Sequence, residues 1–479
     1  MNNYFHDIDD CIHLDGAIHG NESSPHFRPL HFAWNSLNYK LFGIEPFGYH
    51  ALSLLVHFLS SLLIWHLIWQ LTQKPLAAVV GGVAFGAFYA PNEVVMWMAA
   101  ACSLLVVLFI LLACNFYLHY LSKRKWSFFL ATIVCMIGAM GCKEDCVVLG
   151  PILIALEIHA RGWRSLMSKE ALTRYGVLLA LGLAYLSVAY RPELWADRPD
   201  VGHYDVGFGI VPKSLRSVGV LFWPRRIVES EFSSWSFWAG LLLTTGVIIL
   251  GWCDRQRRGT YFVALSICFV GMLAVLPGPD PIVAKRYVYV SVIGAAMLLG
   301  LGFDAIHEWA TKRNLIRLQW ITISGFVLWI VVQVMAIRSL DQYHFGPAGE
   351  RTRALVDGTR NQILPLLQKS NFSEGKVVFI SPMIWNELDY LPMVSVLLDF
   401  PKKRMAYTVE PFDETFIKRL KNGGDLALAT HAVFFQVKGG PIRRLENLAD
   451  APIDAWRERS KVRAGEGKAE TLAVIRFIP

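Results

Sequence analysis

Long apolar stretches separated by short polar ones dominate the first 340 positions of the chain. Runs of about 16–25 apolar residues are typical of helices that cross a membrane. The pattern predicts about ten such spans, at residues 47–71, 75–90, 99–120, 126–140, 146–158, 173–190, 235–252, 261–277, 287–304 and 319–338. The 75–90 and 146–158 runs are short for a full crossing, and Gly81-Gly82 in the first favours close helix packing. We therefore predict an all-α polytopic membrane domain at residues 47–338.

The pattern changes after residue 338. Four segments have the composition of strands, at residues 376–382, 404–409, 431–437 and 471–479. Two more, at 385–398 and 413–422, have helical patterns. Alternating strands and helices predict a small soluble α/β domain at residues 339–479. No glycine-rich phosphate loop follows its first strand, so we expect no nucleotide there.

Composition agrees with a membrane protein of the helical type. The 479 residues are 54% hydrophobic and 18% charged, which is far more apolar than an ordinary soluble protein. A net charge of +8 could suggest nucleic acid, but the basic residues lie in short clusters between apolar runs. The positive-inside bias explains that distribution better, so we expect no nucleic-acid partner.

The loops between the predicted spans give a topology. Lys and Arg number 14 in the loops 72–74, 121–125, 159–174, 253–260 and 305–318, but 3 in 91–98, 141–145 and 278–286. The first set is therefore expected to be cytoplasmic, with residues 1–46, 191–234 and 339–479 on the outer side. An outer N-terminus without a preceding apolar segment predicts a helix missing before residue 1, through truncation or a wrongly chosen start. The alternative is that this short N-terminus is translocated unaided.

A stretch in the 191–234 loop mixes basic and aromatic residues. IVPKSLRSVGVLFWPRR, at residues 210–226, suits a helix lying at the lipid headgroups. We favour a simple surface anchor; the alternative is a shelf that grips a lipid phosphate.

The eight cysteines are scattered, mostly within apolar runs. Because no CxxC pair has a partner pair, a structural zinc site is not expected, and we predict no metal-binding residues. Cys142 and Cys146 flank a short loop and are interpreted as small apolar residues.

The first 46 residues carry the densest group of ionisable side chains. Asp7, Asp9 and Asp10 are carboxylates directly before a predicted span, where one of them could act as general base toward a hydroxyl. The alternative is a solvated acidic loop. Arg28 and His50 follow within the same loop and the start of the next predicted helix, which favours a general base over a solvated loop.

His50 and His57 are seven residues apart and therefore share one helix face. His57 would lie about 10 Å deeper than His50 at the usual helical rise. Polar residues at membrane depth often mark a site, but a hydrogen-bonded structural histidine is an equally good interpretation of His57.

Glu93 and the pair Lys143-Glu144 also lie at the predicted outer face. Glu93 follows Pro91-Asn92 at a helix start, where it could merely complement the helix dipole. Lys143 and Glu144 lie in a very short loop and could be a surface ion pair that contributes little to stability.

Lys285 and Arg286 lie beside Tyr287 at the outer end of a span. Adjacent cations with aromatic neighbours can clamp a phosphate, and cations on the outer face run against the positive-inside bias. The alternative is ordinary interfacial snorkelling.

These motifs resemble the GT-C superfamily of polyprenyl-phosphate-sugar-dependent membrane glycosyltransferases, in the branch of the transmembrane tetratricopeptide O-mannosyltransferases and their bacterial relatives. The similarity extends over about residues 4–300. The matching segments are Asp9-Asp10, Phe27-Arg28-Pro29-Leu30, Gly48-Tyr49-His50, Pro91 to Trp97, Lys143-Glu144 and Arg286-Tyr287-Val288-Tyr289. The chain departs from the family in three ways: it lacks the first membrane helix and the tetratricopeptide array, and His6-Asp7-Ile8 precedes its acidic pair. Either Asp7 or Asp9 therefore fits the family's base.

The resemblance implies transfer of a sugar from a polyprenyl-phosphate-linked donor to an acceptor hydroxyl at the outer face of a bacterial plasma membrane. It implies a catalytic Asp in the first loop and substrate binding by Arg28, His50, His57, Glu93, Lys143, Glu144, Lys285, Arg286 and Tyr287. The partners would be membrane lipid, the lipid-linked sugar and a glycan, lipid or protein acceptor; metal use varies among such families. The alternatives are a lipid or glycan transporter without chemistry, which predicts charges at mid-membrane depth, and a membrane scaffold that presents the C-terminal domain.

Overall fold

A computed structural model describes residues 27–43, 45–189, 210–222, 234–273 and 285–340, five strands beyond them, and the single positions Asp357 and Asn361. The chain divides into a unit that ends at Arg338 and a second unit that begins at Ser339.

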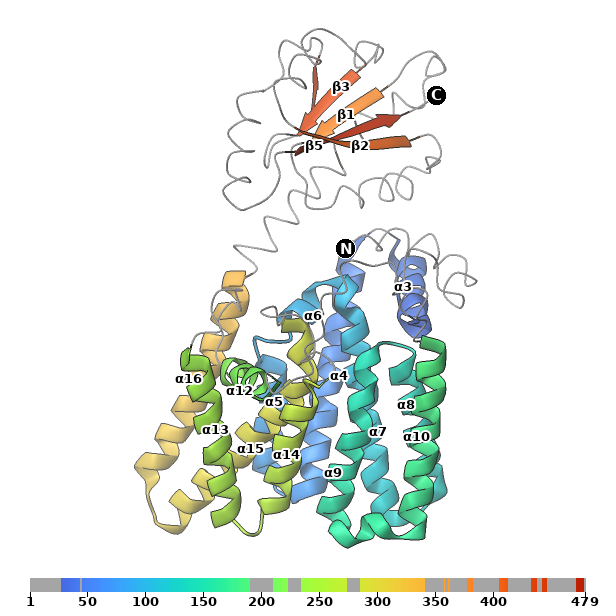
Figure 1. Cartoon of the computed structure of the whole chain (residues 1–479). Coiled ribbons are helices and arrows are strands. Elements are labelled where there is room, and N and C mark those ends of the chain that lie inside the picture. Colours follow the sequence, from blue (N-terminus) through green and yellow to red (C-terminus); the bar gives the residue numbers. More distant parts are fainter. Residues whose placement is uncertain are drawn as a thin grey trace. The chain divides into compact units, whose positions relative to one another are not determined.

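Helices make up almost all of the described part of the first unit (Figure 1). The α-helices are α3 Pro29–Phe42, α4 Pro46–Thr72, α5 Pro75–Ala87, α6 Asn92–Met96, α7 Ala101–Lys123, α8 Trp126–Met140, α9 Leu149–Arg161, α10 Lys169–Ala189, α12 Ile210–Leu221, α13 Ser234–Cys253, α14 Arg258–Val270, α15 Tyr289–Lys312 and α16 Ile316–Leu340. Short 3-10 helices are η1 Met98–Ala100, η2 Glu144–Val148, η3 Trp163–Met167 and η4 Lys285–Val288.

A helix lies at each of the ten predicted spans. Within the described part of the chain, α4, α7, α10, α15 and α16 are long and apolar enough to cross a membrane. The outer surfaces of α4, α10 and α16 leave large apolar side chains exposed, such as Leu54, Phe58 and Leu62 of α4. Such residues need lipid around them, so the helical unit fits an all-α membrane domain. The sequence pattern did not predict α3, which lies in the stretch expected to be a polar loop.

Local sequence explains several helix ends. Proline stands at the first position of α3, α4 and α5, where its missing N–H costs no hydrogen bond and its fixed φ suits the helix. Gln73 and Arg124 end α4 and α7 with left-handed backbone, at φ 53° and 57°. Each turn then leads within two residues into the next helix, which makes consecutive helices neighbours.

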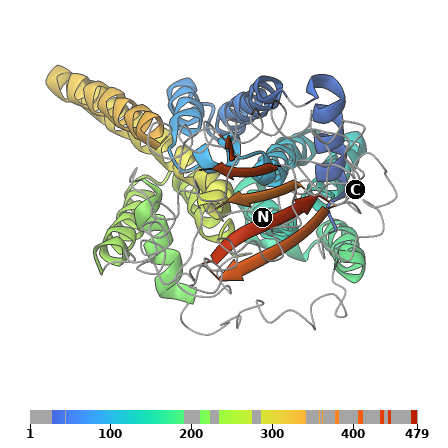
Figure 2. The same cartoon turned by 90° about the horizontal axis from the view of Figure 1, so that it is seen from above.

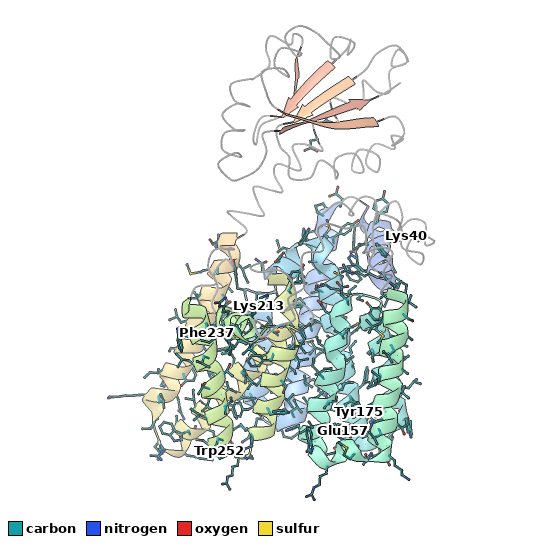
Figure 3. All side chains as sticks on the ribbon, in the orientation of Figure 1. Lys40, Glu157, Tyr175, Lys213, Phe237 and Trp252 are labelled. Carbon is teal, nitrogen blue, oxygen red and sulfur yellow. The ribbon has the colours of Figure 1, made fainter. Side chains whose placement is uncertain are left out.

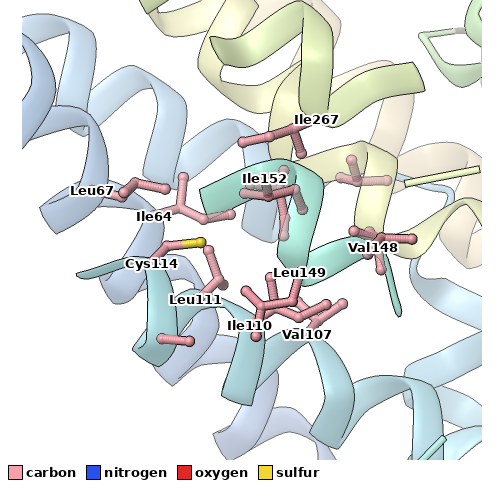
Figure 4. Close-up of a cluster of buried hydrophobic side chains, with 14 of the residues drawn as sticks. Ile64, Leu67, Val107, Ile110, Leu111, Cys114, Val148, Leu149, Ile152 and Ile267 are labelled. Carbon is pink, nitrogen blue, oxygen red and sulfur yellow. The ribbon is translucent and has the colours of Figure 1, made fainter. Parts of the chain in front are cut away.

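The core of the helical unit lies where α4, α7, α9 and α14 meet (Figure 4). Ile64 of α4, Ile110 of α7 and Ile152 of α9 are fully buried there. Figure 4 shows side chains of α7 and α9 interleaved, with Ile267 of α14 on the far side. The cysteines resolved in the described part are free, as predicted for Cys142 and Cys146, and both of these are buried.

Glycines let α15 approach its neighbours closely. A Cβ atom on Gly300 would lie 2.3 Å from the Ala77 carbonyl oxygen of α5. A Cβ atom on Gly81 of α5 would lie 3.2 Å from the Ala296 carbonyl oxygen of α15. A Cβ atom on Gly82 would lie 3.2 Å from the Ser61 carbonyl oxygen of α4. The predicted role of Gly81-Gly82 in close packing is confirmed.

Replacing Gly300 by Ala is expected to lower stability by about 1–3 kcal/mol, because the added methyl group overlaps backbone that cannot turn aside. Gly302, on the same helix, has no atom within 4 Å of an added Cβ. Gly302→Ala should therefore be neutral or slightly stabilising, since Ala is the better helix former. Thermal unfolding of both variants in detergent checks this, and equal shifts would contradict the close contact.

The predicted amphipathic segment forms α12, which packs on α13. A Cβ atom on Gly240 of α13 would lie 1.8 Å from the Leu215 carbonyl oxygen, so the two backbones touch. Lys213 of α12 is marked in Figure 3. The position of α12 at the lipid headgroups stays a prediction, and Trp223, Arg225 and Arg226 lie outside the described residues.

The second unit contains a five-stranded sheet (Figures 1 and 2). Its strands are β1 Val377–Ser381, β2 Met405–Pro411, β3 Ala432–Gln436, β4 Ile442–Leu445 and β5 Thr471–Phe477, in the order β2-β5-β1-β3-β4. β1 pairs in parallel with β3, with Phe379 opposite Phe434, and the other pairs are antiparallel. The four predicted strands are confirmed, and β4 was not predicted. The predicted helices 385–398 and 413–422 lie outside the described residues, so the α/β assignment stays a prediction.

Candidate active site

The start of α3 is docked on the turn that follows α8. The Leu30 backbone N–H donates to the Gly141 carbonyl oxygen at 2.8 Å. A Cβ atom on Gly141 would come within 3.0 Å of the Leu30 side chain, so only a small residue fits the contact. This docking places Arg28, immediately before Pro29, over the turn that carries Lys143 and Glu144.

Arg28 and Glu144 are 116 positions apart in sequence and form a bidentate ion pair. Arg28 Nη2 lies 2.6 Å from Glu144 Oε1, and Nε lies 3.2 Å from Oε2. The Arg28 side chain is 18% exposed and that of Glu144 is 49% exposed. Burial alone lowers the pKa of Arg28, but the Glu144 carboxylate outweighs it and raises the pKa overall. Arg28 therefore keeps its charge while remaining partly open to solvent on the Glu144 side.

Lys143 pairs with Asp145 rather than with its neighbour Glu144. Its Nζ atom lies 2.6 Å from Asp145 Oδ2 and donates to Ser103 Oγ at 3.1 Å. The residue is 4% exposed, so this is a buried pair and not the surface pair considered from the sequence. Burial lowers the pKa of Lys143, and Asp145 more than restores it, so the net shift is upward.

Tyr287 brings the last of the predicted segments to this place. The Lys143 Nζ atom lies 5.0 Å from the centre of the Tyr287 ring, which is cation–π distance. Tyr287 belongs to η4, and η4 packs beside α6, the helix that carries Glu93. The backbone of Lys285 and Arg286 is thereby placed at the same end of the helical unit, while their side chains lie outside what the structure describes.

These contacts define a polar cluster at the N-terminal end of α7. Arg28 Nη1 lies 4.0 Å from Cys102 Sγ, and Cys102 adjoins the Ser103 that Lys143 binds. We call it the anchor cluster; its members are Arg28, Cys102, Ser103, Lys143, Glu144, Asp145 and Tyr287. Sequence reasoning selected four of the seven. Cys102 and Ser103 gave no signal because they open an apolar run, and Asp145 lies in the 141–145 loop but outside the matching Lys143-Glu144 segment.

His57 lies outside this cluster, among α4, α5 and α15. Its Nδ1 lies 2.8 Å from the Tyr289 hydroxyl, and its Nε2 lies 3.4 Å from the Gly86 carbonyl oxygen. The imidazole can therefore donate to Gly86 and accept from Tyr289. Because both ring nitrogens have protein partners, the geometry favours a structural histidine over a substrate-binding one.

His50 and Glu93 lie nearer the entry to the helices. His50 is partly exposed in the first turns of α4, and its Nδ1 has no hydrogen-bond partner within the described part of the chain. Glu93 is in the first turn of α6, where a carboxylate also suits the helix dipole. Both residues are partly exposed, and each stays a predicted binding residue.

Asp7, Asp9 and Asp10 lie outside the described residues, so the predicted base is not located. Among the residues that are described, no group of three or more His, Cys, Asp or Glu side chains is arranged to hold a metal ion. Arg28 of the anchor cluster can bind an anion only if Glu144 moves away from the guanidinium group or shares it with the anion.

Comparison with known proteins gives two sequence matches. Residues 24–189, from before α3 to the end of α10, match the family model for dolichyl-phosphate-mannose-protein mannosyltransferases. The protein O-mannosyl-transferase Tmtc1 of Drosophila melanogaster is 26% identical over 134 residues, which cover 28% of this chain. The match spans 15% of the length of that relative.

A structural comparison covers nearly the whole chain. The crystal structure of ArnT from Cupriavidus metallidurans, bound to undecaprenyl phosphate, matches with a TM-score of 0.50 over 94% of both chains at 13% identity. At that identity the likeness concerns the fold. Together, the shared fold and the mannosyltransferase family match confirm the predicted resemblance of this chain to the GT-C superfamily of polyprenyl-phosphate-sugar-dependent membrane glycosyltransferases.

Proposed function

We propose that the protein is a membrane glycosyltransferase that moves a sugar from a polyprenyl-phosphate-linked donor to an acceptor hydroxyl on the extracytoplasmic face. The observation that carries the proposal is the anchor cluster. It joins three motif segments that are far apart in sequence, 27–30, 143–144 and 286–289, at one end of the helical unit. A scaffold or transporter gives no reason for these particular segments to meet.

The arrangement suits a reaction in which negative charge develops on a phosphate. In the proposed step the acceptor oxygen attacks the anomeric carbon, and the bond from that carbon to the phosphate oxygen breaks. The electron pair of the broken bond stays on the polyprenyl phosphate, and the hydroxyl proton passes to a carboxylate of the first loop, Asp7, Asp9 or Asp10. Such a transfer inverts the configuration at the anomeric carbon.

The cations would stabilise the departing phosphate. Arg28 is oriented by its ion pair with Glu144 and is 18% exposed, so it can bind the phosphate where Glu144 shares the guanidinium. Lys285 and Arg286, in η4, would bind the same phosphate. Tyr287, the next residue of η4, has its ring 5.0 Å from Lys143 Nζ. His50 and Glu93 would bind the sugar or the acceptor.

The proposed setting is the plasma membrane of a bacterium, with the anchor cluster and the C-terminal unit on the outer side. A lipid-linked donor explains why a sugar transferase is mostly apolar helix, because the polyprenyl tail needs a groove between spans. The ArnT structure was determined with undecaprenyl phosphate, which makes that lipid the first carrier to try. The acceptor would be a glycan, a lipid or a protein.

Single replacement of Asp7, Asp9 and Asp10 by Asn tests the base. Loss of one general base is expected to lower sugar transfer from an undecaprenyl-phosphate-linked donor by about 10²–10⁴-fold in one of the three variants. Asp15→Asn, in the same segment, is the control and should keep full activity. Full activity in all three variants would contradict the role given to the first loop.

A further inference from the structure

α16 touches the rest of the helical unit through one narrow stripe. Most of its surface is exposed, and only 6% of its apolar window is buried inside the protein. Figure 2 shows it at the periphery, extending away from the other helices. Phe326, Trp329 and Gln333, at helical spacing, are among the described residues of this stripe. Phe326 packs on Phe303 of α15, and Trp329 meets Phe88 edge to face at 5.0 Å.

Gln333 is the exception to the exposure of α16. It is 1% exposed, and its Oε1 accepts a hydrogen bond from the Tyr89 backbone N–H at 2.9 Å. Its Nε2 atom is buried and has no partner among the described residues. An apolar side chain would avoid the cost of burying that unpaired amide nitrogen. The bond to Tyr89 is therefore the feature that makes a glutamine useful at this position.

The segment that Gln333 holds leads directly to Glu93. α5 ends at Ala87, Phe88 turns out of the helix with extended backbone, and Tyr89 is the next residue. The Asn92 N–H then bonds back to the Tyr89 carbonyl oxygen at 3.1 Å, and the Val94 N–H bonds to Pro91 at 2.9 Å. The N–H that donates to Gln333 thus belongs to the first residue of the turn Tyr89–Glu93. This turn runs into the first residues of α6, the helix that packs beside η4.

We propose that Gln333 is a positioning residue, through which α16 fixes the turn Tyr89–Glu93 and hence the place of Glu93 in the candidate site. The inference rests on the proposed function for its effect on sugar transfer. It adds to that function a helix that none of the sequence motifs involves. Gln333 does not touch the reacting groups in this role; it acts through the backbone of the turn.

Two variants of Gln333 separate its hydrogen bond from its bulk. Gln333→Met keeps the length of the side chain and removes the acceptor. Gln333→Glu, buried as the neutral acid because an unpaired buried carboxylate takes up a proton, keeps a carbonyl oxygen acceptor of the same reach. Gln319 supplies a matched control on the same helix, because its Nε2 donates to Thr311 Oγ1 at 2.7 Å near the opposite end of α16. Gln319→Met should leave the turn and the activity unchanged.

The first measurement is hydrogen–deuterium exchange of the peptide that spans residues 88–97, on the purified full-length protein. We expect faster uptake in Gln333→Met, with wild-type uptake in Gln333→Glu and Gln319→Met, and with no change in peptides from α7. Unchanged uptake in Gln333→Met would overturn the proposal, whether or not the protein transfers sugar.

The second measurement is kcat and KM for sugar transfer by the folded fraction. A misplaced Glu93 should lower kcat/KM about five- to tenfold in Gln333→Met, the scale of one lost hydrogen bond, with recovery in Gln333→Glu. Faster exchange with unchanged kcat/KM would refute the positioning role. If wild-type protein transfers no sugar, the proposed function fails, and the exchange result alone decides whether α16 holds the turn.

Discussion

Replacing Lys143 by Met is expected to destabilise the protein by about 3–5 kcal/mol, because it leaves the Asp145 carboxylate buried without its counter-charge. Asp145 is 6% exposed, and its Oδ2 atom lies 2.6 Å from Lys143 Nζ. The variant also removes the donor to Ser103 and the cation over the Tyr287 ring. The loss should appear as a lower midpoint of thermal unfolding in detergent.

The paired variant Lys143→Met/Asp145→Leu tests the reason. Removing both charges relieves the uncompensated carboxylate, so much of the stability should return although the ion pair is gone. Lys125, an exposed residue at the start of α8, is the control, and Lys125→Met should change stability by no more than about 0.5 kcal/mol. A double variant no better than Lys143→Met would show that something other than a buried unpaired charge causes the loss.

Periodicity was enough to find the helices of the ten apolar runs, but not α3 or β4. Apolar runs predicted a helix at every one of the ten spans, because a run of apolar side chains has few other solutions next to lipid. The same reasoning missed α3, whose Pro29 start is a local signal, but whose placement depends on the Leu30–Gly141 contact 111 positions away. It also missed β4, four residues long, which exists by pairing with β3.

The sequence could predict which segments form the candidate site, but not which charged side chains pair with one another. Motif order brought Arg28, Lys143, Glu144 and Tyr287 to attention, and the structure joins them. Which acid pairs with which cation depends on distances in the folded protein. Glu144 forms an ion pair with Arg28, and Asp145 forms one with Lys143. His57 shows the opposite case, since depth in the membrane suggested a site and its partners turned out to be Tyr289 and Gly86.

A second buried charge network lies at the other end of the helices. Glu157 of α9 is fully buried; its carboxylate is bonded by Arg174 Nη2 at 2.5 Å and by the Tyr117 and Tyr175 hydroxyls at 2.5 and 2.7 Å. Figure 3 marks Glu157 and Tyr175 side by side at the end opposite Lys40. One carboxylate thus ties α7, α9 and α10 together. A glutamate inside the predicted 146–158 span was the available signal, because a charge in an apolar run needs a partner.

Replacing Glu157 by Gln is expected to cost about 3–5 kcal/mol, since Arg174, 1% exposed, would keep its charge but lose its closest carboxylate. The remaining acid, Glu170, is 68% exposed, and its Oε2 lies 3.9 Å from Arg174 Nη1. The amide nearly preserves the shape of the side chain, so the loss would measure charge rather than packing. Glu170→Gln is the matched control for an exposed acid near the same arginine: Glu170 is 68% exposed and pairs with Arg124 at 2.7 Å and with Arg174 at 3.9 Å. Such exposed pairs are worth about 0–1 kcal/mol.

The comparison needs no assumption about function, because the network lies far from the anchor cluster along α7. Thermal unfolding of both variants in one detergent gives the difference directly, and Glu157→Gln/Arg174→Met, which removes both charges, should regain part of the loss. If Glu157→Gln and Glu170→Gln shifted the midpoint equally, Arg174 would have to find water or another acid, and the helices α7, α9 and α10 would pack more openly at this end than their contacts indicate.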